Sequence, residues 1–298
     1  MIQIQKTTLE GSVAVELTTP VLRLVAVTDF GPRLAHLSLA GGENLLFWKP
    51  GKMRRGAWDL RGGHRVWAAH PGADESEDSY APDNAPCELE IFGDGFRVTG
   101  ATCPLNATRR GFAVRAVSAD RLEVENFLTN AGNMLYCAGV WALTCTLPGV
   151  GARYAIPLGD GSAWDNFSLV HFRTWGGQGK GGFHDPQIAV GDETLVVTPR
   201  GVENKRMIQA PRGIFAMSDA ARALTFAKKV DWRPGEAYPL NTNLAFYIGP
   251  DNFMVEMESM GPSRTLKPGE TLRHPETWVL RKGAVAVEKA APLMKLFA

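Results

Sequence analysis

Residues 29–47, DFGPRLAHLSLAGGENLLF, contain the pattern that decides the fold. Apolar residues recur through Leu34–Leu39, the turn-forming letters AGGEN follow, and a second apolar run begins at Leu45. Short apolar runs bounded by glycine and asparagine are typical of β-strands joined by a turn. The stretch therefore predicts a strand, a turn and a second strand.

The same pattern of short apolar runs between turn residues recurs along the chain. Glycine and proline clusters such as LPGVGA and LKPGET separate the runs, and helical periodicity is confined to the tail after Lys282. We predict an all-β fold, a large antiparallel β-sandwich formed by residues 1–298 as one domain, with a short tail from about residue 283. The predicted strands are Val13–Leu17, Leu22–Val27, Leu34–Leu39, Leu89–Phe92, Arg97–Thr99, Ala113–Val117, Leu122–Phe127, Leu195–Val197, Leu244–Ile248 and Phe253–Met257.

Composition limits the functional classes. The 298 residues are 45% hydrophobic and 21% charged, with a net charge of +1, so a substantial core can form without the basic bias of a nucleic-acid-binding protein. The N-terminus lacks the apolar segment of a signal peptide, and the uncharged run Met134–Leu147 is shorter than the roughly 20 residues of a membrane helix. We expect a cytoplasmic protein with reduced cysteines and with no nucleic-acid or membrane partner. Its oligomeric state stays open.

The stretch 62–71, GGHRVWAAHP, concentrates side chains that carry chemistry. His64 and His70 could ligate a metal or transfer a proton, Arg65 could hold an anion or sugar hydroxyls, and Trp67 could stack on an apolar sugar face. Each of these uses has a structural alternative: a satisfied histidine, an ordinary salt bridge for Arg65, and a core position for Trp67.

We expect no metal and no other cofactor. His64 and His70, six residues apart, could share a metal on an extended strand, but a catalytic zinc site usually needs three protein ligands and no further ligand motif is present. The segment 175–182, WGGQGKGG, departs from a phosphate-binding loop in two ways. Thr174 stands where the first glycine would be, and Gly181 follows the lysine where a serine or threonine would bind magnesium.

Three segments together resemble the galactose mutarotase-like superfamily of aldose epimerases. PRLAHLSLAGGENLLF matches its first hairpin, RGGHRVWAAHPG is similar to the Arg-Gly-Gly stretch of its sugar-phosphate branch, and EMES with LKPGETLRH is similar to its closing segment. The similarity is greatest to an uncharacterised branch with GGHR-W and PDN motifs. It implies a β-supersandwich whose concave face holds a pyranose, where a glutamate removes the anomeric hydroxyl proton and a histidine protonates the ring oxygen.

The resemblance assigns the base and leaves the acid open. Glu258 takes the position of the base, whereas Ala131 stands where members of the superfamily place the acid histidine. His64 is our preferred acid because it lies in a shared motif, and His171 and His184 are the alternatives. If residues 253–260 form a strand, Glu256 shares a face with Glu258. The two could form a solvated pair, or Glu256 could raise the pKa of its neighbour or pair with an arginine such as Arg33 or Arg65.

Further residues are candidates for substrate binding. Asp83 and Asn84 could contact sugar hydroxyls or could form an Asx turn before Pro86. The glycine-rich segment around His184 could be a lid. The full set of substrate-binding candidates is Arg65, Trp67, Arg33, Asp83, Asn84, His171, His184, Asp185 and Glu256.

Two functions from different classes follow. The first is a cofactor-independent epimerase or isomerase of an aldose or sugar derivative, with a glutamate base and a histidine acid. The second is a non-catalytic carbohydrate-binding protein, which Ala131 favours. A polysaccharide lyase or hydrolase is a third alternative and would require a cleft. In each case the expected partner is a carbohydrate, whose identity the sequence does not specify.

Overall fold

The computed structural model describes residues 1–298 apart from 52, 56–57, 71–82, 161–167 and 172–183. The side chains of residues 55 and 169–171 also lie outside the description. Within the described residues, two large antiparallel sheets and one small sheet account for the regular structure, with a short helix near the C-terminus.

The first large sheet has eleven strands in the order β1-β2-β3-β4-β7-β12-β21-β20-β17-β14, with β22 paired to β12. The bounds of its strands are β1 Gln3–Leu9, β2 Ser12–Thr18, β3 Leu22–Val27, β4 Arg33–Leu39, β7 His64–Ala69, β12 Tyr136–Thr146, β14 Leu169–His171, β17 Asn204–Gln209, β20 Leu244–Ile248, β21 Val255–Met260 and β22 Arg264–Leu266.

The second large sheet has ten strands in the order β15-β16-β13-β18-β19-β23-β11-β10-β9-β8. The bounds of its strands are β8 Glu88–Phe92, β9 Gly95–Thr99, β10 Thr108–Ala116, β11 Arg121–Asn130, β13 Ala152–Pro157, β15 Ile188–Val190, β16 Thr194–Val197, β18 Ile214–Asp219, β19 Leu224–Lys229 and β23 Thr271–Lys282. The remaining elements are the small β5 Arg54–Arg55 and β6 Trp58–Asp59 pair, the 3-10 turns η3 Pro239–Asn241 and η4 Pro250–Asn252, and the helix α1 Ala290–Lys295.

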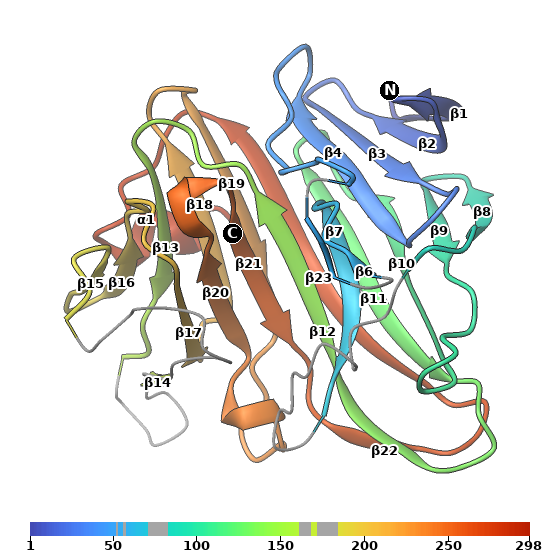
Figure 1. Ribbon diagram of the computed structural model, residues 1–298. Helices are drawn as coiled ribbons and strands as arrows, with labels where there is room; N and C mark the ends of the chain where they lie inside the picture. Colours follow the sequence, from blue (N-terminus) through green and yellow to red (C-terminus); the bar gives the residue numbers. More distant parts are fainter. Residues whose placement is uncertain (52, 56–57, 71–82, 161–167, 172–183) are drawn as a thin grey trace.

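The two large sheets pack face to face, and Figure 1 shows β12 and β21 of the first sheet beside β23 of the second. Alternation along each strand puts one set of side chains between the sheets, which we call the inner face, and the other set on the outer face. The main core lies on the inner faces and includes Val66, Val140 and Met257 of the first sheet with Phe112 and Trp278 of the second. This core fixes which residues of each strand remain for the outer face.

The predicted antiparallel β-sandwich is confirmed. The second half of the opening pattern differs from the prediction, because Leu46 makes only an isolated bridge to Thr146 instead of continuing a hairpin strand. Leu45 N–H still donates to Leu37 O of β4, whereas Phe47 N–H donates to Cys145 O of β12, so the segment crosses from one strand to the other within three residues. The long strands β12 and β23 were not among the predicted runs. β12 is buried along most of its length and reads as one continuous apolar run without alternation. β23 carries charged residues and Pro275 between its buried positions, so it shows no clear apolar run either.

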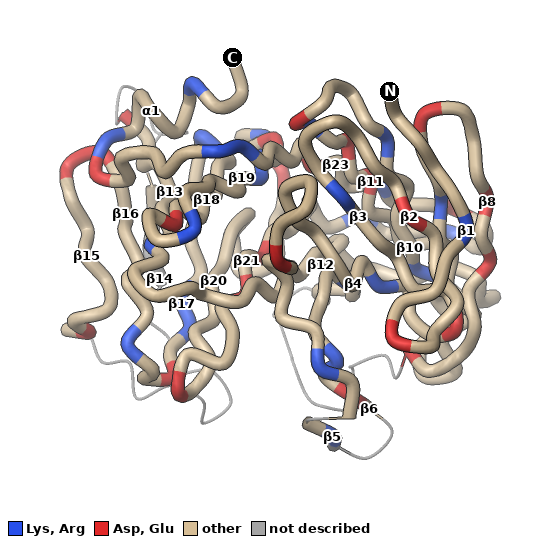
Figure 2. Tube along the Cα trace, turned by 90° about the horizontal axis from the view of Figure 1, so that it is seen from above, with Lys and Arg blue, Asp and Glu red and all other residues tan. Residues whose placement is uncertain are grey.

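The C-terminal tail packs on the outer face of the second sheet. Leu293 and Leu296 join a small apolar cluster with Ala155, Ala216 and Ala227 of that sheet. In the part of the chain that is described, no helix has the length and apolar character needed to cross a membrane. Figure 2 shows basic and acidic residues interspersed along the trace, in keeping with the net charge of +1.

Candidate functional site

A cavity of about 280 Å³ lies on the outer face of the first sheet. It crosses the strands β7, β12, β21, β20 and β17, and loop residues near β6 and η4 close its rim. The lining residues are Met53, Trp58, Leu60, Arg65, Trp67, Trp141, Leu143, Glu203, Lys205, Tyr247, Pro250, Phe253, Met254 and Glu256. Aromatic surface and several charged side chains therefore meet in one concave space.

Glu256 and Glu258 share the outer face of β21, as strand alternation predicts. Glu256 lines the cavity and is held by Arg65, whose Nη2 lies 3.0 Å from Glu256 Oε1. The Cys145 thiol lies 3.4 Å from the same oxygen. Both carboxylate groups belong to buried residues, so the alternative of a solvated pair is wrong.

Glu258 lies beside the cavity without lining it. Its Oε2 accepts a hydrogen bond from Trp141 Nε1 at 2.8 Å and lies 3.1 Å from Lys205 Nζ. Its Oε1 is buried and has no hydrogen-bond partner among the described residues. Burial raises the pKa of Glu258 and the charge of Glu256 adds to this effect, while Lys205 and Trp141 act against it. Trp141 and Lys205, which do line the cavity, separate Glu258 from the open space.

Aromatic rings form much of the cavity wall. The Arg65 guanidinium lies 4.2 Å from the ring centroid of Trp67, and Trp67 packs edge-on against Trp141 with 5.5 Å between centroids. Lys205 Nζ lies 4.8 Å from the Trp141 ring centroid. Trp67 thus belongs to the outer-face cluster and not to the core between the sheets. Both indoles are buried, at 2% and 3% exposure, with a cation over each ring, so the wall combines aromatic edges with the charges of Arg65 and Lys205.

His64 lies on the opposite face of the sheet from Glu258. It pairs in register with Thr144, which pairs with Met257, and all three side chains belong to the inner face. His64 Nδ1 is 2.9 Å from Thr144 Oγ1, and Nε2 is 2.8 Å from Asn126 Oδ1. Burial lowers the pKa of His64 to about 4. The expectation that His64 faces the site as the acid partner of Glu258 is therefore wrong, because the sheet lies between the two side chains.

A buried polar cluster extends from His64 across the inner face. Lys228 Nζ lies 2.7 Å from Glu276 Oε1 and donates to Thr144 Oγ1 at 3.1 Å. Ser259 Oγ donates to Glu276 Oε1 at 2.5 Å, and Trp278 Nε1 donates to Oε2 at 2.8 Å. Burial alone would raise the pKa of Glu276, but Lys228 and two nearby histidines outweigh it and lower the pKa to about 2. Both carboxylate oxygens of Glu276 are thus satisfied.

Arg33, Asp83 and Asn84 lie outside the first cavity. Arg33 is fully buried, forms an ion pair with Asp83 at 3.4 Å and donates to Gly62 O at 3.2 Å. Burial lowers the pKa of Arg33 to about 10, although Asp83 opposes this. Asn84 Oδ1 accepts from Arg61 Nη2 at 2.8 Å. These contacts fasten segment 83–84 to the Gly62 turn, where φ of +92° favours glycine.

Asp185, His184, His171 and Ala131 complete the set of predicted positions. Asp185 accepts from Gln187 N at 2.8 Å and also from Asn204, and His184 is exposed beside it. Neither residue lines the first cavity. His171 ends β14 and pairs in register with Met207; its side chain lies outside the described residues, as does the glycine-rich segment 172–183. Ala131 follows β11 in the second sheet and is not a lining residue.

Sequence reasoning missed Trp141, Lys205 and Tyr247, which complete the cavity wall. Cys145, Glu256, Tyr247 and Lys205 stand in one cross-strand row through β12, β21, β20 and β17. Alternation within each strand was available as a signal, but the row also requires the strand order, which the sequence does not state. Within the described residues no three His, Cys, Asp or Glu side chains cluster as a metal site. The expectation of a metal-free reaction stays a prediction.

The architecture defines the class: a two-sheet antiparallel β-sandwich with a charged, aromatic cavity on one outer face. No model of a protein family matches the chain, and no curated protein matches it in sequence. Solved structures do match, and they show that the chain has the galactose mutarotase-like fold.

Three of these structures illustrate the similarity. A putative aldose 1-epimerase from Escherichia coli K12 is 12% identical, with a TM-score of 0.58 over 95% of this chain and 100% of the other. A putative mutarotase from Salmonella typhimurium is 14% identical, with a TM-score of 0.56 over 94% of each chain. A TPR-domain containing protein from Parabacteroides distasonis is 13% identical, with a TM-score of 0.61 over 93% of this chain and 48% of the other. The chain thus spans about half of that last protein.

Proposed function

We propose that this protein binds a carbohydrate in the outer-face cavity and acts as a cofactor-independent epimerase or isomerase of an aldose or sugar derivative. The observation that carries the proposal is the meeting, in one cavity of about 280 Å³, of indole rings with the Arg65–Glu256 pair and with Lys205. Sugars present apolar C–H faces to aromatic rings and hydroxyls to charged groups, so both kinds of contact are needed. The galactose mutarotase-like fold supports the same class of ligand.

Glu258 is the proposed general base. A carboxyl with an unpartnered buried oxygen and a raised pKa is better suited to take a proton near neutral pH than one already satisfied by two donors. Because Trp141 and Lys205 separate it from the cavity, Lys205 has to yield its contact when a sugar hydroxyl approaches. Glu256, which lines the cavity and is bonded to Arg65, is the alternative base and is otherwise a hydroxyl-binding group.

His171 is the proposed general acid in place of His64. The support for it is the backbone register: Glu258, Ala245, Met207 and His171 occupy one cross-strand row through β21, β20, β17 and β14. The row spans three strand spacings, about 14 Å between its outermost backbones.

A non-catalytic carbohydrate-binding protein is the second candidate function. The observation that favours it is that Glu258 does not line the cavity, so the carboxylate in contact with a ligand is the one already paired with Arg65. Under this alternative the cavity needs hydrogen bonds and stacking surfaces and has no use for a raised pKa.

Ligand-observed NMR with anomer exchange, applied to neutral, acidic and phosphorylated aldoses, separates the two functions because it reports binding and turnover together. For the epimerase, Glu258→Gln should abolish exchange while sugar affinity stays within about tenfold, or ~1.4 kcal/mol. His171→Asn should remove most of the rate, and His70→Asn, which alters a histidine outside the cavity, should leave it unchanged.

Results that differ from these expectations would change the proposal in defined ways. Exchange that survives Glu258→Gln would move the base to Glu256. Exchange that survives His171→Asn would remove the acid role from that residue. A sugar that binds without accelerated exchange would establish the non-catalytic function, and failure of every sugar to bind would overturn the proposal.

A further inference from the structure

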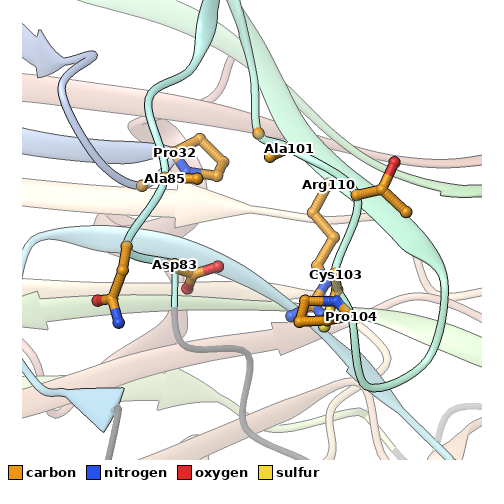
Figure 3. A pocket seen from close by; sticks show the side chains of 11 residues that line it. Pro32, Asp83, Ala85, Ala101, Cys103, Pro104 and Arg110 are labelled. Atoms are coloured by element: carbon orange, nitrogen blue, oxygen red, sulfur yellow. The ribbon is translucent and has the colours of Figure 1, made fainter.

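A second cavity, of about 190 Å³, lies where the turn at Pro32, the segment 83–85 and the loop 100–104 meet the start of β10. Figure 3 shows Asp83 on one side of this cavity and Arg110 with Pro104 on the other. It shares no lining residue with the first cavity. Its lining residues are Gly31, Pro32, Asp83, Asn84, Ala85, Gly100, Ala101, Thr102, Cys103, Pro104 and Arg110.

Arg110 is the unexplained group in this cavity. The residue is only 3% exposed. Its Nε donates to Thr108 Oγ1 at 3.3 Å, while Nη2 is buried and has no hydrogen-bond partner. No described residue forms an ion pair with its guanidinium. A guanidinium stays charged at every physiological pH, so burial leaves Arg110 with a charge that no described residue matches.

The neighbouring charges do not compensate for it. Asp83 lies across the cavity, but its carboxylate is already paired with Arg33 at 3.4 Å. Arg61 adds a further cation, with Nη1 donating to Asp83 O at 2.8 Å and Nε 3.6 Å from an oxygen of Asp59. The carboxylates of Asp83 and Asp59 thus pair with Arg33 and Arg61. Neither of them pairs with Arg110.

We propose that this second cavity is a binding site for a compact oxyanion, a carboxylate or a phosphate, held on the guanidinium of Arg110. Buried charges are normally paired, and an oxyanion supplies both the missing charge and acceptors for a planar fork of N–H donors. Thr102 lines the same space, and a threonine hydroxyl can donate one further hydrogen bond. The Asp83 carboxylate confines the anion to the Arg110 side. The site is separate from the proposed carbohydrate cavity and does not depend on it.

Thermal unfolding of the full chain tests the site, with sodium phosphate and sodium acetate added separately at constant ionic strength against sodium chloride. An anion present at ten times its Kd should raise Tm by about 2–4 °C. Arg110→Met should lose the response. Arg115→Gln, which removes a half-exposed arginine of the same strand, is the matched control and should keep it.

A second variant keeps the test decisive if Arg110→Met does not fold. Ala101→Glu introduces a carboxylate from an exposed position in the cavity wall, so the tethered group should take the ligand's place and abolish the response to added anion. A response to phosphate alone or acetate alone would support the site and identify its oxyanion class. A response that persists in Ala101→Glu or Arg110→Met, or no response in the wild-type protein, would overturn the proposal.

Discussion

Two groups with the same three side chain types lie on opposite sides of the first sheet, one built from the second sheet and one from the first. On the inner face Lys228, Glu276 and Trp278 form one Lys–Glu–Trp group, with Lys Nζ 2.7 Å and Trp Nε1 2.8 Å from the carboxylate oxygens. On the outer face Lys205, Glu258 and Trp141 form another, with corresponding distances of 3.1 and 2.8 Å. We call them the inner triad and the outer triad.

The triads differ in how completely the carboxylate is satisfied. In the inner triad Ser259 adds a donor, both oxygens are bonded, and the pKa of Glu276 falls to about 2. In the outer triad both donors act on the same oxygen, the other has none, and burial raises the pKa of Glu258. The inner triad therefore holds a fixed charge that stabilises the sandwich, whereas the outer triad holds a carboxyl that can exchange a proton.

Lys228→Met should produce the largest difference between the triads. The substitution leaves Glu276 buried without its cation, and breaking such a pair costs about 3–5 kcal/mol. Lys205→Met should lower the free energy of unfolding by roughly half as much, because Glu258 can take up a proton more readily and the adjoining cavity admits water. Urea unfolding at pH 7 measures both. Equal losses would show that the two triads are energetically equivalent.

The next largest effect should be a loss of stability in acid, caused by the two buried histidines of the inner face. Burial lowers the pKa of both His64 and His274 to about 4. In the unfolded chain these histidines have the ordinary pKa of about 6.5. Between these two pH values the unfolded chain therefore binds protons that the folded chain does not. Stability should therefore be greatest above a pH of about 6.5 and fall as the pH drops towards 4, by about 3 kcal/mol for each histidine. Urea unfolding across this range measures the slope, and His64→Asn should reduce it.

The outer triad should contribute with the opposite sign. The pKa of Glu258 is raised on folding, so its effect favours the folded state at low pH and is lost as the pH rises through the folded value. Glu258→Gln should remove this opposing contribution and steepen the loss of stability in acid. A wild-type protein equally stable at pH 4 and pH 6.5 would contradict the assignment of the inner histidines.

The sequence predicted the sandwich because strand runs and turns are local. Alternation in the run to Met260 also predicted that Glu256 and Glu258 share a face, and the register confirms it. The same alternation separates His64 from Arg65 in GGHRVW. It does not say which of the two faces the core, because both residues are polar and only the packing of the second sheet decides.

The rest of the site depends on strand order. Trp141 lies on β12 and Lys205 on β17, two strands far apart in sequence that both approach Glu258 of β21. Their contacts arise from long-range pairing, for which no local pattern gives the partner. The inner triad was missed for the same reason: Lys228 and Glu276 meet through the pairing of β19 with β23.

The smallest expected effect concerns the two indole N–H groups. Trp141→Phe and Trp278→Phe each remove one donor at 2.8 Å from a buried carboxylate, at a cost of about 1–3 kcal/mol. The Trp141 hydrogen bond lowers the pKa of Glu258, so its loss should raise that pKa further. Glu276 keeps Lys228 and Ser259 after Trp278→Phe and should remain ionised at neutral pH. Carbon-13 NMR titration of labelled glutamate carboxyls measures the pKa of both groups.

Two results would contradict the difference between the triads. One is a pKa of Glu258 that is unchanged in Trp141→Phe, and the other is a Glu276 that takes up a proton near pH 7 in Trp278→Phe.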